Sequence, residues 1–479
     1  MLAANSVQEL LVAAEAISDC GGSEFAGNRF SPFSWSAVKI SQRQARYHNK
    51  RGTISSYSPV ARSSRISPER PENPVRLEMQ HTSFATSRET QSDALQPQRA
   101  DTALVAALLI AFNLIAFVLV QRGNPDFVKG DFKMFYTAAV ALRSGHATDL
   151  YSRDLHVSMQ QQLLPSLPLR DVKVYTHPPY ELLVFLPFSV LPYKAACYCW
   201  LALTLLLAVL CGRMLSGYAA VLALFPFLAI MLEQQDSVLV LLILIGSWLG
   251  LRRNLDSRAG FLLGLGLFRF QIVVPLALIL LFWKPKLLKG FALSGTLVTL
   301  ISLAMVGPTG LRSYVGYVSS MAHDSATAVS ERYQIDPRTN PTLRGLVYEL
   351  ASRGGESVSP TAARVLPAIL GLIDLLCLGL ARKFMRTDAS PEVKFAFAVL
   401  LALLLSFHLL MHDLILLALP FTLLRGLPAR WPLVPFYLTP LVYCFYPPSK
   451  AWMGLFLFSS CLLIIFRKPR SPSFNQDFL

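Results

Sequence analysis

The chain has 479 residues, of which 53% are hydrophobic and 15% are charged, whereas a soluble protein carries about 25% charged residues. The formal net charge is +15, and the seven cysteines show no spacing typical of a disulfide framework or a metal site. The composition argues against a soluble protein. Basic cytoplasmic loops explain the positive charge better than nucleic-acid binding does.

Residues 1–100 are rich in Ser, Arg, Gln and Pro and lack sustained periodicity, which predicts a disordered polar segment. Met79 begins a short polar leader that runs directly into the first apolar segment, so the chain offers an alternative start and leaves open whether residues 1–78 belong to the native protein. We expect an integral-membrane domain over 101–470 and a short cytoplasmic tail over 471–479.

Apolar segments recur after residue 101, and many are long enough to cross a bilayer core of about 30 Å. They predict an all-α, polytopic transmembrane bundle of about nine to twelve membrane segments, including re-entrant pieces. The segments cover 102–120, 180–191, 195–212, 218–232, 236–251, 260–283, 288–306, 362–381, 394–410, 411–424, 432–446 and 450–466.

The basic residues between these segments predict the orientation, because cytoplasmic loops are enriched in Lys and Arg. One topology satisfies nearly all the basic clusters: segment 102–120 leads out, 195–212 returns, and 260–283 enters and turns back near Arg269. The long loops 121–179 and 307–361 then lie outside. The amphipathic run FKMFYTAAVALRSG in the first of these loops predicts an interfacial helix.

Polar residues gather at the outer ends of these segments. An ionisable residue at membrane depth costs roughly 2.5–3.5 kcal/mol on insertion scales, so each is a candidate for function. Together they predict an outward-facing polar cavity with an acid, a fixed cation and several amides. The candidates are Asp131, Lys133, His177, Glu233, Gln234, Gln235, Asp236, Arg269, Gln271, Asn340, His408, His412 and Asp413.

Several of these residues have simpler explanations. Gly130-Asp131 is a common turn pair, and the segment EQQDS is a plausible polar turn between two helices. Arg269 needs an anion, either a protein carboxylate or a ligand phosphate. His408 and His412 are four residues apart and would share a face of one helix, where a hydrogen-bonded cluster is favoured over a metal site.

This inventory suits an enzyme that uses a lipid-phosphate substrate, with the cation on the phosphate and the acid as a base. It also suits a transporter or flippase of lipid-linked sugars, which needs the same cation and amides without chemistry. The absence of an internal repeat and the unequal loops argue against the transporter. A non-catalytic membrane subunit is a third possibility.

The ordered motifs carry a resemblance. Over about residues 110–425 the chain resembles the polyprenol-phosphate-mannose-dependent α-mannosyltransferases, glycosyltransferase family 87, which have the C-type integral-membrane fold. The motifs are GDFKMFYTAAVALRSG, YTHPPYELLVFLPF, EQQDSVLVLLI, FRFQIVVPLALILLFWKPK, NPTLRGL and FHLLMHDLILLALP.

The resemblance implies transfer of a hexose, usually mannose, from a polyprenyl-phosphate donor to a glycan or glycolipid acceptor outside the plasma membrane. Asp131 matches the family's catalytic carboxylate and is expected to act as general base. Arg269 stands where many relatives have Lys followed by Pro, so with Gln271 it would hold the donor phosphate. The first outer loop has no D-x-D or E-x-D pair, so no metal cofactor is predicted. The expected cavity lining is Lys133, Tyr136, His177, Gln235, Asp236, Asn340, His408, His412 and Asp413.

Overall fold

The computed structural model describes residues 96–123, 127, 130–165, 167–324, 337–352, 360–438 and 450–466. Within these ranges every regular element is a helix and none is a strand, which confirms the predicted all-α class. The predicted polar segment up to residue 95, the tail 471–479 and part of the predicted segment 432–446 lie outside the described residues.

The chain is a multi-pass membrane protein. Within the described residues, five helical stretches are apolar and, by length alone, sufficient to span a bilayer, and four shorter apolar stretches accompany them. Together they fall within the predicted nine to twelve segments. The long stretches are Ala103–Arg122, Tyr193–Met214, Asp256–Leu281, Leu287–Ser319 and Arg364–Met385; the short ones are Pro179–Val190, Ser237–Arg252, Met411–Leu423 and Lys450–Ile465.

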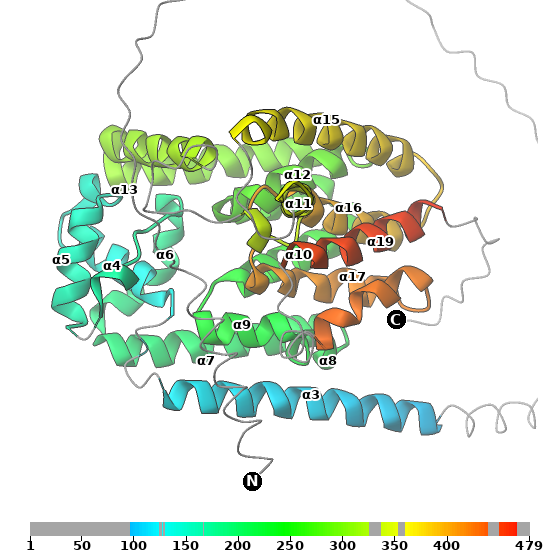
Figure 1. Cartoon of the computed structure of the whole chain (residues 1–479), viewed down its shortest axis with the longest axis horizontal. Coiled ribbons are helices and arrows are strands. Elements are labelled where there is room, and N and C mark those ends of the chain that lie inside the picture. The colour runs from blue at the N-terminus through cyan, green and yellow to red at the C-terminus, as the bar shows by residue number, and fades with distance from the viewer. Residues whose placement is uncertain are drawn as a thin grey trace, which may run out of the picture. The chain divides into compact units, whose positions relative to one another are not determined.

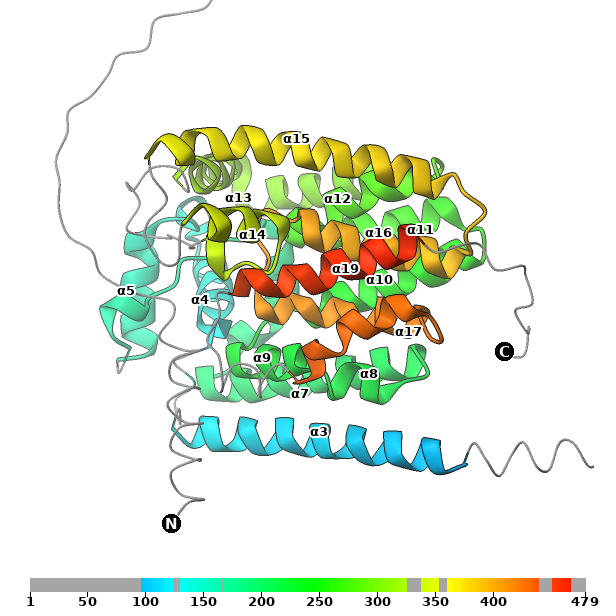
Figure 2. The ribbon, with the colours of Figure 1, turned by 45° about the vertical axis from the view of Figure 1, so that its right-hand side comes forward.

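Most of these helices lie roughly alongside one another in the membrane unit, residues 100–479 (Figures 1 and 2). The α-helices are α3 (Gln96–Arg122), α4 (Phe132–Arg143), α5 (Arg153–Leu163), α6 (Leu182–Phe185), α7 (Tyr193–Met214), α8 (Tyr218–Leu222), α9 (Phe225–Glu233), α10 (Ser237–Arg252), α11 (Asp256–Leu265), α12 (Phe270–Leu281), α13 (Leu287–Asp324), α14 (Leu343–Ala351), α15 (Pro360–Met385), α16 (Pro391–Leu405), α17 (Ala418–Leu423) and α19 (Gly454–Ile465).

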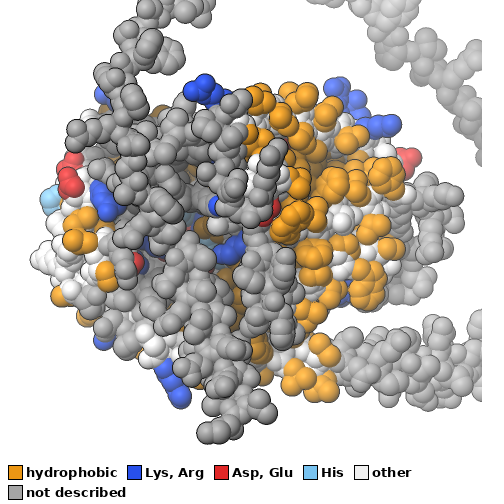
Figure 3. All heavy atoms as spheres, in the orientation of Figure 1, with side chains coloured by type: hydrophobic (Ala, Val, Ile, Leu, Met, Phe, Trp, Pro, Cys, Tyr) orange, Lys and Arg blue, Asp and Glu red, His pale blue; other side chains and the backbone are white. Residues whose placement is uncertain are grey.

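Helices α10, α12 and α16 form the buried centre, whereas α3 and α15 run along opposite sides (Figures 1 and 2). Few residues of α3 and α15 are buried. Because these helices are apolar yet exposed, their outer surfaces suit contact with lipid. Figure 3 shows hydrophobic side chains gathered over the α15–α19 part of the visible face, and charged side chains at both ends of that face, including the end that carries α5.

The chain reverses direction between α11 and α12. A continuous helix over 256–281 would be about 39 Å long, yet Asp256 lies 3.4 Å from the ammonium group of Lys284. The hydroxyl of Ser257 also donates a hydrogen bond of 3.2 Å to the carbonyl of Lys286. The helix breaks at the 3-10 turn Gly266–Arg269. This confirms the reversal predicted near Arg269 and places that residue at its tip.

The predicted outer loops contain further helices. Helix α13 is broken at Gly307, which adopts φ +66° before Pro308, a conformation that glycine takes at little cost. The amphipathic run in the first loop forms the predicted helix, α4, and its location at the membrane interface stays a prediction. Most of the side chains of α4 are buried, because its apolar face packs on the 179–190 segment: the rings of Phe135 and Phe185 stack with centroids 4.3 Å apart.

Helices α11 and α13 approach so closely that glycine is required at their contact. A Cβ atom at Gly290 would collide with the carbonyl of Ser257. We therefore expect Gly290→Ala to lower the free energy of unfolding by about 1–3 kcal/mol. Gly379 on α15 has open space around it, so Gly379→Ala is the matched control and should be neutral or slightly stabilising. Thermal unfolding in detergent measures both, and equal melting temperatures would contradict this packing.

Candidate active site

Asp131 immediately precedes α4 and is fixed against the turn between α9 and α10. Its main-chain N–H donates a hydrogen bond of 2.7 Å to the carbonyl of Glu233. A Cβ atom at Gly130 would collide with the side chain of Gln234, so the preceding glycine permits this close approach. The Gly-Asp pair is therefore a turn, and the turn presents Asp131 to the EQQD segment.

The carboxylate of Asp131 has two partners. One oxygen pairs with the ammonium group of Lys173 and the other accepts a hydrogen bond from the side-chain amide of Gln235. Burial acts to raise the pKa of Asp131, but the charge and hydrogen bond of Lys173 outweigh it and hold the pKa below 3.8. Asp131 is therefore ionised at neutral pH, as a general base must be.

Lys173 was not predicted from the sequence, because a lysine in a polar loop has no distinctive pattern. The structure fixes it through Gln160 of α5, whose amide bonds both the N–H and the carbonyl of Lys173. The lysine side chain is still 45% exposed while that of Asp131 is 13% exposed. Lys173 therefore lies at the solvent edge of the site.

Arg269 is buried, and protein carboxylates neutralise it. One Nη contacts Asp236 and donates a hydrogen bond of 2.7 Å to the side-chain oxygen of Gln235. The other Nη lies 3.8 Å from Asp413. Protein carboxylates are one of the two kinds of anion that the sequence analysis considered for Arg269.

Gln235 connects the cation to the acid. Its amide oxygen accepts from Arg269 and its amide nitrogen donates to Asp131. Because Arg269 can only donate and ionised Asp131 can only accept, both amide positions are determined. One side chain thus separates a fixed positive charge from an ionised carboxylate.

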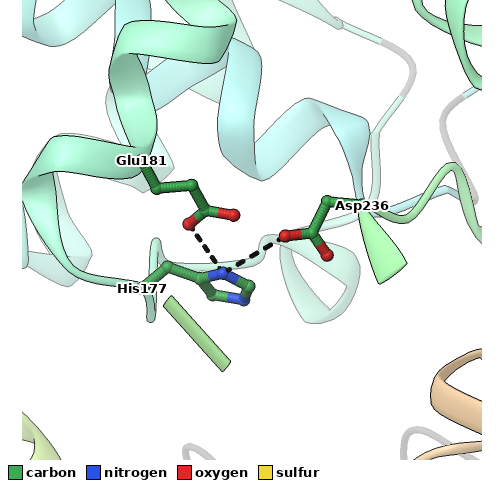
Figure 4. A group of neighbouring side chains, drawn as sticks. All are labelled: His177, Glu181 and Asp236. Atoms are coloured by element: carbon green, nitrogen blue, oxygen red, sulfur yellow. Dashed lines mark ion pairs between the residues drawn. The ribbon is translucent and has the colours of Figure 1, made fainter. Parts of the chain in front are cut away.

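His177, Glu181 and Asp236 form a buried group beside Arg269 (Figure 4). His177 Nδ1 lies 2.7 Å from the carboxylate of Glu181 and 3.9 Å from that of Asp236. Burial, and then Arg269, lower the pKa of His177 to about 3, so the ring is neutral. Glu181 was missed from the sequence, although it lies four residues after His177 in the same motif.

The same three side chains could hold a metal ion, since one ligand atom of each lies within 4.8 Å of the others. A histidine nitrogen with two carboxylate oxygens is a donor set that suits several divalent metals. Arg269, however, already supplies positive charge to Asp236. An added divalent cation would be repelled by that guanidinium.

The segment 406–413 closes the site from another part of the chain. Asp413 accepts hydrogen bonds from the hydroxyl of Ser237 at 2.7 Å and the N–H of Leu410 at 3.1 Å. His412 Nδ1 contacts the carboxylate of Glu233. His412 and Asp413 are therefore held by Glu233, Ser237 and Leu410, whereas the predicted cluster joined them to His408.

The expectation that His408 and His412 share a helix face is wrong. Helix α16 ends at Leu405 and the next helical turn begins at Met411. Side chains satisfy the intervening backbone: Asn340 Oδ1 accepts from the N–H of Leu409 at 2.9 Å, and the hydroxyl of Ser406 donates to the carbonyl of His408 at 2.7 Å. These bonds replace helical ones and anchor Asn340 at the site.

The other predicted residues lie around this centre. Lys133 is fully buried on α4, and burial, followed by the charge of Lys173, lowers its pKa to about 8. The hydroxyl of Tyr136 donates a hydrogen bond of 2.7 Å to the carbonyl of Leu191, within an aromatic group rather than toward Asp131. Gln271 is buried and His408 is partly exposed; neither side chain hydrogen-bonds to the described part of the chain.

The arrangement thus presents an ionised acid and a buried cation across one amide at an end of a membrane bundle. Comparison with known families decides its class: a model of glycosyltransferase family 87 matches residues 175–411. The chain belongs to glycosyltransferase family 87. It is therefore a membrane glycosyltransferase of the C-type fold that uses a polyprenyl-phosphate-linked sugar donor. No curated protein and no solved structure is significantly similar to it.

The family match includes His177, Gln235, Asp236, Arg269 and Asn340. Asp131 precedes it, and His412 and Asp413 follow it directly. Contacts in the structure join these residues to the matched region. Family membership favours an enzyme over the transporter and the structural subunit that the sequence left open.

The ion pair with Lys173 leads to a pH prediction. In wild type the lowered pKa of Asp131 keeps its carboxylate ionised, so titration of Asp131 should cause no loss of kcat/KM near neutral pH. Lys173→Met removes the largest interaction that lowers the pKa, whereas burial, which raises it, remains. We expect kcat/KM of the variant to fall with decreasing pH at a higher midpoint than in wild type. Lys286→Met, at an exposed lysine, is the control, and identical acid limbs would refute this coupling.

Proposed function

We propose that this enzyme transfers mannose from polyprenyl-phosphate-mannose to a glycan or glycolipid acceptor at the extracytoplasmic face of the plasma membrane. The observation that carries the proposal is the bridge from Asp131 through Gln235 to Arg269. A base for the acceptor and a cation for the leaving phosphate are the two charges that this reaction needs.

In the proposed mechanism, Asp131 takes the proton from the acceptor hydroxyl as its oxygen attacks the anomeric carbon of the donor. The new carbon–oxygen bond forms while the bond to the phosphate oxygen breaks, and polyprenyl phosphate leaves with the electron pair. A phosphate is a stable anion, so no general acid is required. Lys173 and Gln235 orient the carboxylate.

Arg269 and Gln271 are proposed to hold the donor phosphate. Two carboxylates already face Arg269, but its Nε is buried and has no hydrogen-bond partner among the described residues. An incoming phosphate oxygen would satisfy that donor. Asp236 and Asp413 together carry one more negative charge than Arg269 neutralises. This excess negative charge would help to release the anionic product.

The proposed orientation follows from the ends of the helices. Helix α10 begins next to Asp236 and ends at Arg252, and the α11–α12 reversal begins and ends near Asp256 and Lys284. The basic residues Arg252 and Lys284 therefore lie at the end of the bundle opposite Arg269. The positive-inside rule assigns this basic end to the cytoplasm.

The base assignment is tested by Asp131→Asn. The amide keeps the shape of the side chain but cannot accept a proton, so transfer should fall by about 10²–10⁴-fold. Binding of the donor should change little. Asp149→Asn, at an exposed acid after the same helix, is the control. Transfer of labelled mannose to membrane acceptors measures the rate, and wild-type turnover by Asp131→Asn would remove this role.

The phosphate assignment is tested by two substitutions of Arg269. Arg269→Ala should weaken donor affinity more than Arg269→Lys does, because lysine keeps the charge. Arg269→Ala also leaves two buried carboxylates without their cation, which costs about 3–5 kcal/mol of stability. Donor affinity is therefore measured on the folded fraction, with the melting temperature recorded beside it. Equal donor affinities in both variants would rule out phosphate binding by Arg269.

A further inference from the structure

A cavity that combines mostly apolar walls with two arginines lies far from Asp131. It has a volume of about 230 Å³ and lies between α3, α8 and the α17 region. Helix α7 begins at Tyr193, which contacts the loop before Asp131 through the carbonyl of Phe127, and its 22 residues span about 33 Å. Gly217, which lines the cavity, follows the far end of α7. The cavity is therefore separated from the proposed active site by the length of a membrane helix.

Two arginines face this cavity without acidic partners. Arg425 and Arg430 both line it, and neither has a carboxylate within ion-pair distance in the described ranges. Within the described part of the chain, the side chain of Arg425 donates one hydrogen bond, to the main-chain carbonyl of Ser216 at 3.3 Å. Arg430 stacks 3.8 Å from the ring of Phe421, and its buried Nε has no hydrogen-bond partner in the ranges that the structure describes. This contrasts with Arg269, which two carboxylates neutralise.

Most of the remaining lining is apolar and reaches the lipid-facing surface. Leu109 and Val105 of α3 line the cavity together with alanines of α8. Val105 is 55% exposed, and the neighbouring Leu108 is 61% exposed. Helix α3 is held to α8 by Asn113, whose amide donates to the carbonyl of Leu222 at 3.0 Å. The cavity therefore joins a cationic pocket to a surface that suits acyl chains.

We propose that this cavity binds the headgroup of an anionic phospholipid from the leaflet opposite the active site. Arg425 and Arg430 would bind the phosphate through charge-assisted hydrogen bonds, and the acyl chains would lie along α3. Basic pockets between membrane helices at the cytoplasmic face suit anionic headgroups. A free phosphate could use the two arginines but not the apolar wall, so the experiment separates these two sources.

The test uses native mass spectrometry of the full-length protein in a neutral detergent, titrated with phosphatidylglycerol or phosphatidylcholine. We expect wild type to bind phosphatidylglycerol at least about tenfold more tightly, since two arginines contribute. In the double variant Arg425→Gln/Arg430→Gln this preference should disappear. Arg253→Gln, an exposed arginine at the same end of the bundle, should retain it.

Two further measurements keep the test decisive if loss of the Arg430 stacking unfolds the protein. Arg425→Gln alone should weaken phosphatidylglycerol binding severalfold, because this exposed side chain makes one main-chain bond. Leu109→Trp should fill the cavity and weaken binding with both arginines present. Unchanged affinity in these variants would refute the site. Displacement of the lipid by equimolar glycerol phosphate would overturn the lipid assignment in favour of a free phosphate ester.

Discussion

The burial of the Arg269 charge is the constraint on which the rest of the active site depends. A guanidinium at the tip of a reversal within a membrane bundle cannot lose its proton and cannot reach water. It is stable there only because carboxylates and an amide surround it. Asp236, Asp413 and Gln235 meet this requirement, and they come from two segments far apart in the sequence.

These contacts determine where the polar side chains can lie. The turn that supplies Gln235 and Asp236 also receives the main-chain bond of Asp131, so the proposed base is held near the proposed cation. His177 and Glu181 pack against Asp236 from the other side. These polar groups are therefore confined to one end of the bundle, where a lipid-linked donor and the proposed glycan or glycolipid acceptor could both approach.

The opposite end follows different electrostatics. There arginines gather without acids, and membrane phosphates can supply the missing negative charge. Arg430 rests on an aromatic ring and Arg425 on a main-chain carbonyl, so neither needs a protein carboxylate to hold its position. The protein thus buries Arg269 with carboxylates of its own at one end of the bundle. At the other end Arg425 and Arg430 line a cavity that reaches the lipid-facing surface.

Much of the architecture was predictable from local pattern. Long apolar runs predicted membrane helices, and the basic residues at both ends of segment 260–283 predicted the reversal near Arg269 that the structure shows. The ordered motifs also identified the family. Each of these inferences depends on neighbouring residues, or on the preserved order of motifs.

Only the tertiary structure decided which side chains meet. Ser237 and Asp413 are 176 residues apart and Asp131 and Gln235 are 104 apart, distances over which periodicity carries no information. Lys173 and Glu181 became visible as site residues only when their partners were located. His408 and His412 failed to share a helix because Asn340, more than 60 residues away, bonds the backbone between them. The sequence by itself determined the membrane helices and the classes of polar group, whereas long-range packing decided their pairing, since a buried charge is stabilised by whatever the fold brings beside it.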